Sequence, residues 1–165
     1  MRSEGARESP RRIHWLPLSL LYFQSVSSSR TERMEMFATW LYVSTSTLEE
    51  NGNDEIASIR STAQSRNPGL GLTGVLIFSG RHFAQFLEGP DAGLETMKAS
   101  IFRDQRHWGV LTLQSQSTER RRYGRWSLAY SGRATFIDRV LSEALRENDG
   151  RKLLSCMDHF VADIR

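Results

Sequence analysis

The chain has 165 residues, of which 39% are hydrophobic and 25% charged, and this composition is typical of one globular domain with its own core. The formal net charge of +3 is mild, and the excess of arginine falls in the first 33 residues, so we expect no nucleic-acid partner. A single cysteine, Cys156, excludes an internal disulfide and a cysteine-based zinc site, which favours a reducing, cytoplasmic setting without a bound metal.

The N-terminal residues 1–36 differ from the rest of the chain. An arginine pair precedes a short apolar run, residues 16–23, which has some features of a secretory signal. A proline and a serine interrupt this run, and it is too short to span a bilayer. We therefore interpret residues 1–36 as a disordered leader or an over-called start, with Met34 or Met36 as alternative starting residues, and expect no membrane association.

A strand and then a helix follow this segment. Residues 39–44 are rich in aromatic and β-branched side chains, which predicts a strand. Ile56, Ile59 and Ala63 recur at helical spacing and predict the buried stripe of a helix. We expect this helix to end at residues 67–69 (Asn-Pro-Gly), because a proline biases the residue before it away from the helical conformation.

The centre of the chain alternates between strands and helices. Two apolar runs, residues 72–78 and 81–88, are joined by Ser-Gly and predict a hairpin. Apolar residues at helical spacing over residues 94–101 predict a second helix, and residues 108–113 and 122–130 predict two further strands.

Two amphipathic stripes, residues 136–144 and 153–164, predict two C-terminal helices. The order of elements predicts an α+β fold, a ferredoxin-like mixed sheet with two helices on one face and the C-terminal helices capping the other. Residues 37–132 would then form one domain, and residues 133–165 a C-terminal helical extension.

The segment RNPGLGLTGVLIFSGRHFAQFLEGP, residues 66–90, resembles the centre of a BLUF domain, the family of blue-light sensors that use FAD. Residues 41–44 resemble the first strand of that family, residues 104–107 its aspartate-x-arginine-histidine turn, and residues 122–128 its last strand. The resemblance covers about residues 39–132, and the members that match best are short ones without a fused effector. It implies a photoreceptor that binds FAD non-covalently and is not an enzyme.

Tyr42 and Gln85 are the candidate photoactive residues. Strand alternation points Tyr42 to the face opposite Leu41 and Val43. Without the resemblance, Tyr42 would be interpreted as an ordinary core tyrosine. The resemblance implies that it donates an electron and a proton to the excited flavin. Gln85 has apolar neighbours, and its amide carries both a donor and an acceptor. The resemblance implies that this amide links the tyrosine to the flavin and then rearranges or tautomerises, which moves the flavin absorption to the red without a lasting redox change.

Further cofactor-binding residues follow from the same resemblance. Asn67 would donate to the flavin carbonyl edge, although taken alone it is a helix terminator. Arg66 stands where the family commonly has a second asparagine. Asp104, Arg106 and His107, taken alone a solvated turn, would contact or frame the ribityl and phosphate part of FAD, and arginine suits phosphate chemically.

Trp126 and Leu128 are the candidate signal-relay residues, and Trp126 also counts among the photoactive ones. Strand alternation places both residues on one face with Tyr130. Without the resemblance, this face would be interpreted as ordinary hydrophobic core. The resemblance places the family's tryptophan at Trp126 and typically a methionine at the position of Leu128. Leucine keeps the volume and loses the thioether, so we expect a different relay or dark-recovery rate but unchanged flavin binding.

Two other classes of protein are alternatives: a ferredoxin-like interaction or RNA-binding module without flavin, and a small flavin-dependent oxidoreductase. Paired exposed aromatic residues and a clustered basic surface are not evident, and no acid, base or nucleophile set appears. The 33 residues after Gly132 are few for an effector domain of usual size. We therefore expect output through the C-terminal helices, to a separate downstream signalling protein or through formation of a homo-oligomer.

Overall fold

The computed structural model describes residues 36–48, 53–132 and 134–162. The predicted leader, residues 1–36, therefore lies outside the described residues except for Met36, and so does the end of the C-terminal extension after residue 162. No helix among the described residues is long and apolar enough to cross a membrane.

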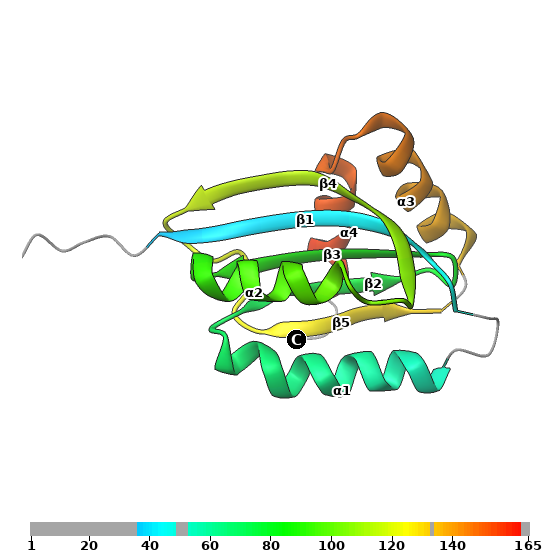
Figure 1. Ribbon diagram of the computed structural model, residues 1–165. Helices are drawn as coiled ribbons and strands as arrows, with labels where there is room; N and C mark the ends of the chain where they lie inside the picture. Colours follow the sequence, from blue (N-terminus) through cyan, green and yellow to red (C-terminus); the bar gives the residue numbers. More distant parts are fainter. Residues whose placement is uncertain (1–35, 49–52, 133, 163–165) are drawn as a thin grey trace, which may run out of the picture. The chain divides into compact units, whose positions relative to one another are not determined.

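The described part of the chain follows the predicted order of strands and helices (Figure 1). The elements are β1 (Phe37–Ser46), α1 (Asn53–Gly69), β2 (Thr73–Phe78), β3 (His82–Gly89), α2 (Asp91–Ile101), β4 (His107–Thr118), β5 (Trp126–Ser131), α3 (Thr135–Glu147) and α4 (Arg151–Ala162). The sheet has the order β4-β1-β3-β2-β5, in which β2 and β5 are parallel and the other neighbours antiparallel. The predicted α+β fold with a mixed, ferredoxin-like sheet is confirmed.

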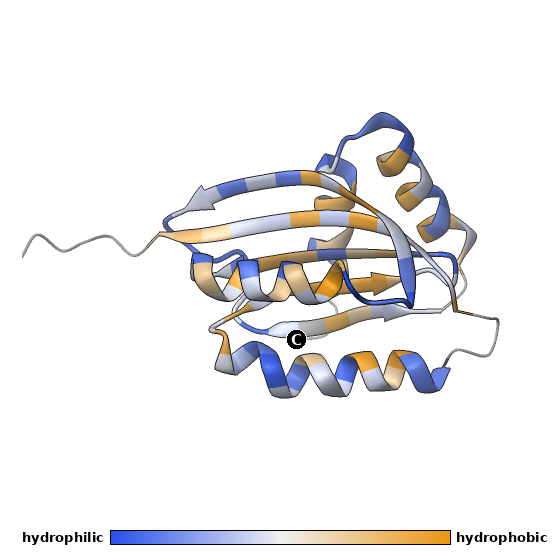
Figure 2. Cartoon of the chain, viewed as in Figure 1, coloured by the Kyte–Doolittle hydropathy of each residue, from blue (hydrophilic) through white to orange (hydrophobic). Residues whose placement is uncertain are grey.

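Alternation along β1 separates two hydrophobic layers. Leu41 and Val43 belong to the core that α3 and α4 cover, whereas Trp40 and Tyr42 belong to the core on the side of α2. Figure 2 shows hydrophobic residues along the central strands and an alternation of hydrophobic and hydrophilic positions in α3. The predicted placement of the C-terminal helices on the second face of the sheet is confirmed.

The first helix ends within the predicted residues 67–69, but the prediction that Asn67 leaves the helical conformation is wrong. Helix α1 continues through Asn67 and Pro68 to Gly69. An interior proline removes one backbone hydrogen bond, from its own position to the carbonyl four residues earlier. Here Pro68 and Gln64 both lie on the exposed side of the helix, so water can satisfy the carbonyl that loses its partner. Asn67 consequently sits inside the last turn of α1, with 1% of its surface exposed.

The last strand is shorter than predicted and is bent. It begins at Trp126 instead of residue 122. The register with β2 shifts between Leu76 and Ile77, which pair with Leu128 and Tyr130, and one extra residue on β5 absorbs the shift. Leu128 therefore packs on the core of the α1 side, whereas Tyr130 packs on the α3/α4 side against Phe160. The prediction that Trp126, Leu128 and Tyr130 share one face is wrong for Tyr130.

Helices α1 and α2 approach closely at one end. A Cβ atom at Gly93, in the first turn of α2, would lie 2.2 Å from the carbonyl oxygen of Leu70, which directly follows α1. Only glycine allows this contact without a shift of the backbone. The contact brings the start of α2 against the end of α1.

Candidate functional site

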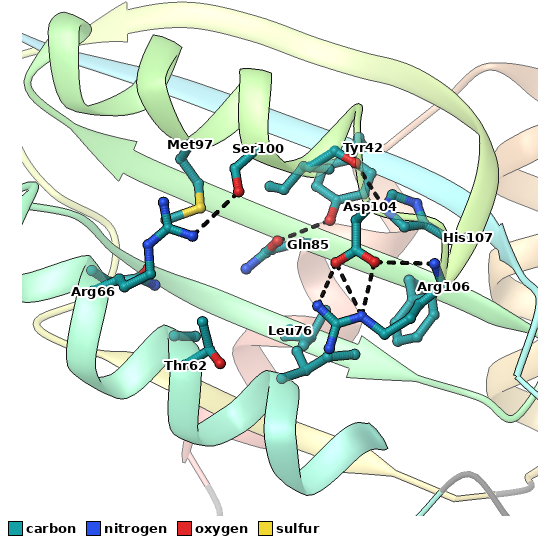
Figure 3. A pocket seen from close by; sticks show the side chains of 15 residues that line it. Tyr42, Thr62, Arg66, Leu76, Gln85, Met97, Ser100, Asp104, Arg106 and His107 are labelled. Carbon is teal, nitrogen blue, oxygen red and sulfur yellow. Dashed lines mark hydrogen bonds and ion pairs between the residues drawn. The ribbon is translucent and has the colours of Figure 1, made fainter. Parts of the chain in front are cut away.

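A cavity lies between α1, α2 and the sheet. Its lining combines apolar side chains with a small number of polar ones, which is typical of sites for organic cofactors. The lining residues are Tyr42, Ile59, Thr62, Ala63, Arg66, Asn67, Leu76, Phe83, Gln85, Met97, Ser100, Ile101, Asp104, Arg106 and His107 (Figure 3).

Tyr42 and Gln85 lie directly opposite each other on the adjacent strands β1 and β3. The Tyr42 hydroxyl donates a hydrogen bond of 2.9 Å to Oε1 of Gln85, and both side chains are buried. The amide nitrogen of Gln85 makes no hydrogen bond to the residues that the structure describes. Gln85 thus holds the tyrosine hydroxyl with one end of its amide and keeps the donor end free at the cavity.

The surroundings of Tyr42 keep its hydroxyl protonated. Burial, and to a lesser degree the nearby carboxylate of Asp104, raises the pKa of Tyr42 above its usual range. The ring stacks on Trp40, with 4.4 Å between the centroids, and the indole nitrogen of Trp40 is anchored on Thr112 at 2.9 Å. Tyr42 is therefore a fixed hydrogen-bond donor at neutral pH.

Asn67 is the second polar group that faces the cavity with unused hydrogen-bonding capacity. Both its Oδ1 and its Nδ2 are buried and have no partner among the described residues. A buried amide without partners costs about 1–3 kcal/mol. A ligand that presents an acceptor and a donor side by side would satisfy both atoms.

Asp104 and Arg106 form an ion pair beside the cavity. Arg106 Nε donates to both carboxylate oxygens, at 2.8 and 3.1 Å, and its NH2 group donates to Oδ2. The hydrogen bond from the Arg106 side chain holds the pKa of Asp104 below its usual range. Both side chains are thus charged, and the pair has no net charge.

His107 connects β4 to β1 and to the end of α2. Burial lowers the pKa of His107, so the ring is neutral at pH 7. Its Nε2 lies 3.0 Å from the carbonyl oxygen of Ile101, which can only accept, so Nε2 carries the proton. Nδ1 then accepts from the Ser44 hydroxyl at 2.9 Å. His107 fixes the wall of the cavity next to Tyr42.

Of the sequence-predicted site residues, the cavity brings together Tyr42, Asn67, Gln85, Asp104, Arg106 and His107. Trp126 and Leu128 do not line it. Leu128 lies opposite Leu76, which in turn lies opposite Gln85, so one strand separates them. The indole nitrogen of Trp126 is buried without a partner among the described residues.

Several lining residues were not predicted as site residues. Ile59, Ala63, Met97 and Ile101 were expected only as the core faces of two helices, and Thr62 and Ser100 carried no pattern. The only sequence signal was the apolar stripe of α1, which also fits ordinary core. In the structure Ile59 and Ala63 are only half-buried, because they face the cavity instead of close-packed side chains.

The matching family model is "BLUF: Sensors of blue-light using FAD", over residues 37–129. The chain belongs to the BLUF family. It is therefore a blue-light sensor domain that uses FAD.

Curated relatives share this region and extend well beyond it. The chain is 35% identical over 71 residues to the blue light- and temperature-regulated antirepressor BluF of Escherichia coli, covering 43% of this chain and 18% of that protein. It is 35% identical over 89 residues to the photoactivated adenylate cyclase subunit alpha of Euglena gracilis, covering 53% of this chain and 9% of that protein.

Solved structures agree on the fold. The BLUF protein BlrB in its dark state has a TM-score of 0.64 at 24% identity, covering 80% of this chain and 99% of that chain. The photo-activated state of BlsA has a TM-score of 0.55 at 27% identity, covering 67% of this chain and 78% of that chain.

The residues of the cavity fit a flavin. The apolar walls suit the ring system, and the free amide of Asn67 matches the donor and acceptor atoms that alternate along the carbonyl edge of a flavin. The donor end of the Gln85 amide offers a further hydrogen bond.

Replacing Asn67 by leucine is expected to weaken flavin binding without destabilising the flavin-free protein. In flavin-free protein the change removes two unsatisfied buried polar atoms, so the free energy of unfolding should stay equal or rise by about 1 kcal/mol. Flavin affinity should fall about tenfold or more, because two hydrogen bonds are lost. Denaturant unfolding and flavin titration measure the two effects.

Gln64→Leu is the matched control, since Gln64 lies on the exposed side of the same helix and outside the cavity. It should change flavin affinity by less than about twofold. A flavin affinity that is equally unaffected by Asn67→Leu would rule out this role of Asn67.

Proposed function

We propose that the protein converts blue light into a rearrangement of hydrogen bonds around Gln85, and that α3 and α4 carry the change to a partner. The observation that supports this proposal most strongly is the buried hydrogen bond of 2.9 Å from the Tyr42 hydroxyl to Gln85 Oε1 at the cavity wall. In this arrangement Tyr42, the proposed proton donor, contacts an amide that can form hydrogen bonds in either orientation.

Bound FAD would supply the absorption of blue light and an excited state that accepts an electron. Tyr42 would give up an electron and its hydroxyl proton, and take both back within the cycle. Gln85 would rotate or tautomerise while its hydrogen bond to Tyr42 is broken, because its amide can bond in either orientation. The new hydrogen bond of Gln85 would shift the absorption to the red and leave no lasting redox change.

Other residues would hold the cofactor. Asn67 would bond the carbonyl edge of the ring, and Asp104, Arg106 and His107 would frame the ribityl part. Trp126 and Leu128 would pass the change at Gln85 across the sheet. The contact of Leu128 with the core that contains Leu76 supports this relay.

Both ends of the strand that carries Gln85 are tied to the C-terminal helices, which supports them as the output. At the hairpin end of β3, Asp138 of α3 accepts from the Ser79 hydroxyl at 3.0 Å and contacts His82 Nδ1 at 2.8 Å. A shift of β3 along its length would therefore act on α3.

At the other end of β3, the carboxylate of Glu88 is fully buried. It accepts the backbone N–H groups of Arg122 and Tyr123 at 2.7 and 2.6 Å. The side chains of these two residues bond Asp158 of α4, through Arg122 Nε and the Tyr123 hydroxyl, both at 2.9 Å. Glu88 thus couples β3 to α4 through the segment before β5.

We infer that the output is a protein contact and not catalysis, and that it reaches a separate signalling protein or a second copy of the chain. One curated relative is named an antirepressor, and the relatives named cyclases match over 9% or 10% of their length. We further propose residues 37–132 as the sensor domain, residues 133–165 as its extension, and a cytoplasmic location.

Hydrogen exchange in the dark and under blue light tests the output. We expect protection of backbone amides in residues 135–162 to change with light. Asp138→Asn and Asp158→Asn should each reduce this change while the red shift persists, because they weaken the links to β3 without touching the cavity.

Glu147→Gln is the control, because Glu147 pairs only with the adjacent Arg146 among the described residues. Equal protection of residues 135–162 in both light states, with a full red shift and no change of assembly, would show that the output does not use α3 and α4.

A further inference from the structure

Arg66 lies at the mouth of the cavity, in the last turn of α1. The residue is exposed, and its NH1 group donates to the Ser100 hydroxyl of α2 at 3.3 Å. Figure 3 shows Arg66 and Ser100 meeting between the two helices, whereas Asp104 and Arg106 meet on the other side of Gln85. Arg66 therefore presents a cation beside the space that the cofactor occupies.

The charge of Arg66 is not compensated within the cavity. Asp104 and Arg106 neutralise each other, and His107 is held neutral by burial. Arg66 forms no ion pair with a carboxylate in the part of the chain that the structure describes. The lining as a whole thus carries one free positive charge, and this charge sits on an exposed residue at the rim.

A flavin nucleotide has a matching distribution of charge. Its ring is neutral and fits among the buried groups Tyr42, Gln85 and Asn67, while its phosphate groups are anionic and favour the solvated rim. We propose that Arg66 binds these phosphate groups and makes the site selective for phosphorylated flavins over riboflavin. The proposal rests on FAD as the cofactor and goes beyond it by naming the residue that discriminates.

Arg106 is less suited to this role, although it was the arginine expected to meet the phosphates. Its Nε and NH2 groups, one full side of the guanidinium fork, are taken up by Asp104. Binding a phosphate there would bring the anion next to a carboxylate. To bind a phosphate, Arg66 would have to break only one hydrogen bond, the 3.3 Å contact with the neutral Ser100 hydroxyl.

Equilibrium titration of flavin-free protein with FAD and with riboflavin tests the proposal. Arg66→Gln should weaken FAD binding about tenfold and change riboflavin binding by less than about twofold, since only FAD carries the anionic groups. Arg66→Lys should recover part of the FAD affinity. Raising the ionic strength should weaken FAD binding to the natural chain and have much less effect on Arg66→Gln.

Arg60→Gln is the matched control, because it removes the same charge from an exposed position of the same helix outside the cavity. It should leave the preference for FAD over riboflavin intact. The proposal is overturned if Arg66→Gln weakens both flavins equally or weakens neither. All of these measurements are made in the dark, so a failure of the proposed photochemistry would leave their outcome unaffected.

Discussion

Replacing Tyr42 by phenylalanine is expected to abolish the reversible red shift while the protein keeps its flavin. The change removes the hydroxyl that donates to Gln85 Oε1 and with it the proposed donor of the electron and the proton. It also leaves a buried amide oxygen without its partner, so the free energy of unfolding should fall by about 1–3 kcal/mol. Absorption spectra of dark and lit samples, and denaturant unfolding, measure the two effects.

Tyr123→Phe is the control for this variant. Tyr123 is also buried and also uses its hydroxyl, which donates to Asp158 at 2.9 Å, but it lies outside the cavity. It should keep the red shift and lose less stability, because Asp158 is half-exposed and still pairs with Arg122. Normal cycling of Tyr42→Phe would show that Tyr42 is not the donor.

Replacing Gln85 by leucine is also expected to abolish the red shift, for a different reason. Leucine has a similar size but no amide to rearrange, while Tyr42 stays in place. Flavin fluorescence should therefore be higher in Tyr42→Phe, which lacks the quenching donor, than in Gln85→Leu, which retains it.

Gln116→Leu, on the exposed part of the edge strand β4, is the control and should change neither the red shift nor the fluorescence. A full red shift in Gln85→Leu would contradict the proposal that the amide of Gln85 is the group that changes. Equal fluorescence in Tyr42→Phe and Gln85→Leu would contradict the separate roles of the two residues.

The architecture could be predicted from the sequence because its signals are local. Alternation in β1 correctly predicted that Tyr42 lies on the face of the sheet opposite Leu41 and Val43. The Ser-Gly turn correctly predicted the hairpin of β2 and β3. The details that failed depend on the surroundings of a residue in the fold, which no local pattern gives. The helix continues through Pro68 because the affected carbonyl faces solvent, and Tyr130 changes face because β5 bulges against β2.

The site was predictable in part. The residues named through the resemblance gather in one cavity, with the exception of Trp126 and Leu128. The links from β3 to the C-terminal helices were not predictable. Glu88 is a charged residue at a strand end, where exposure is the usual expectation, and its burial follows from backbone N–H groups that lie 34 and 35 residues later in the chain.

The absorption spectrum of the purified chain with bound FAD, before and after blue light, tests the central claim most directly. The account predicts that the visible flavin band moves to the red as a whole, keeps its intensity, and returns in the dark. A protein that binds FAD but shows an unchanged spectrum, or a band that bleaches under light, would contradict a hydrogen-bond rearrangement around Gln85.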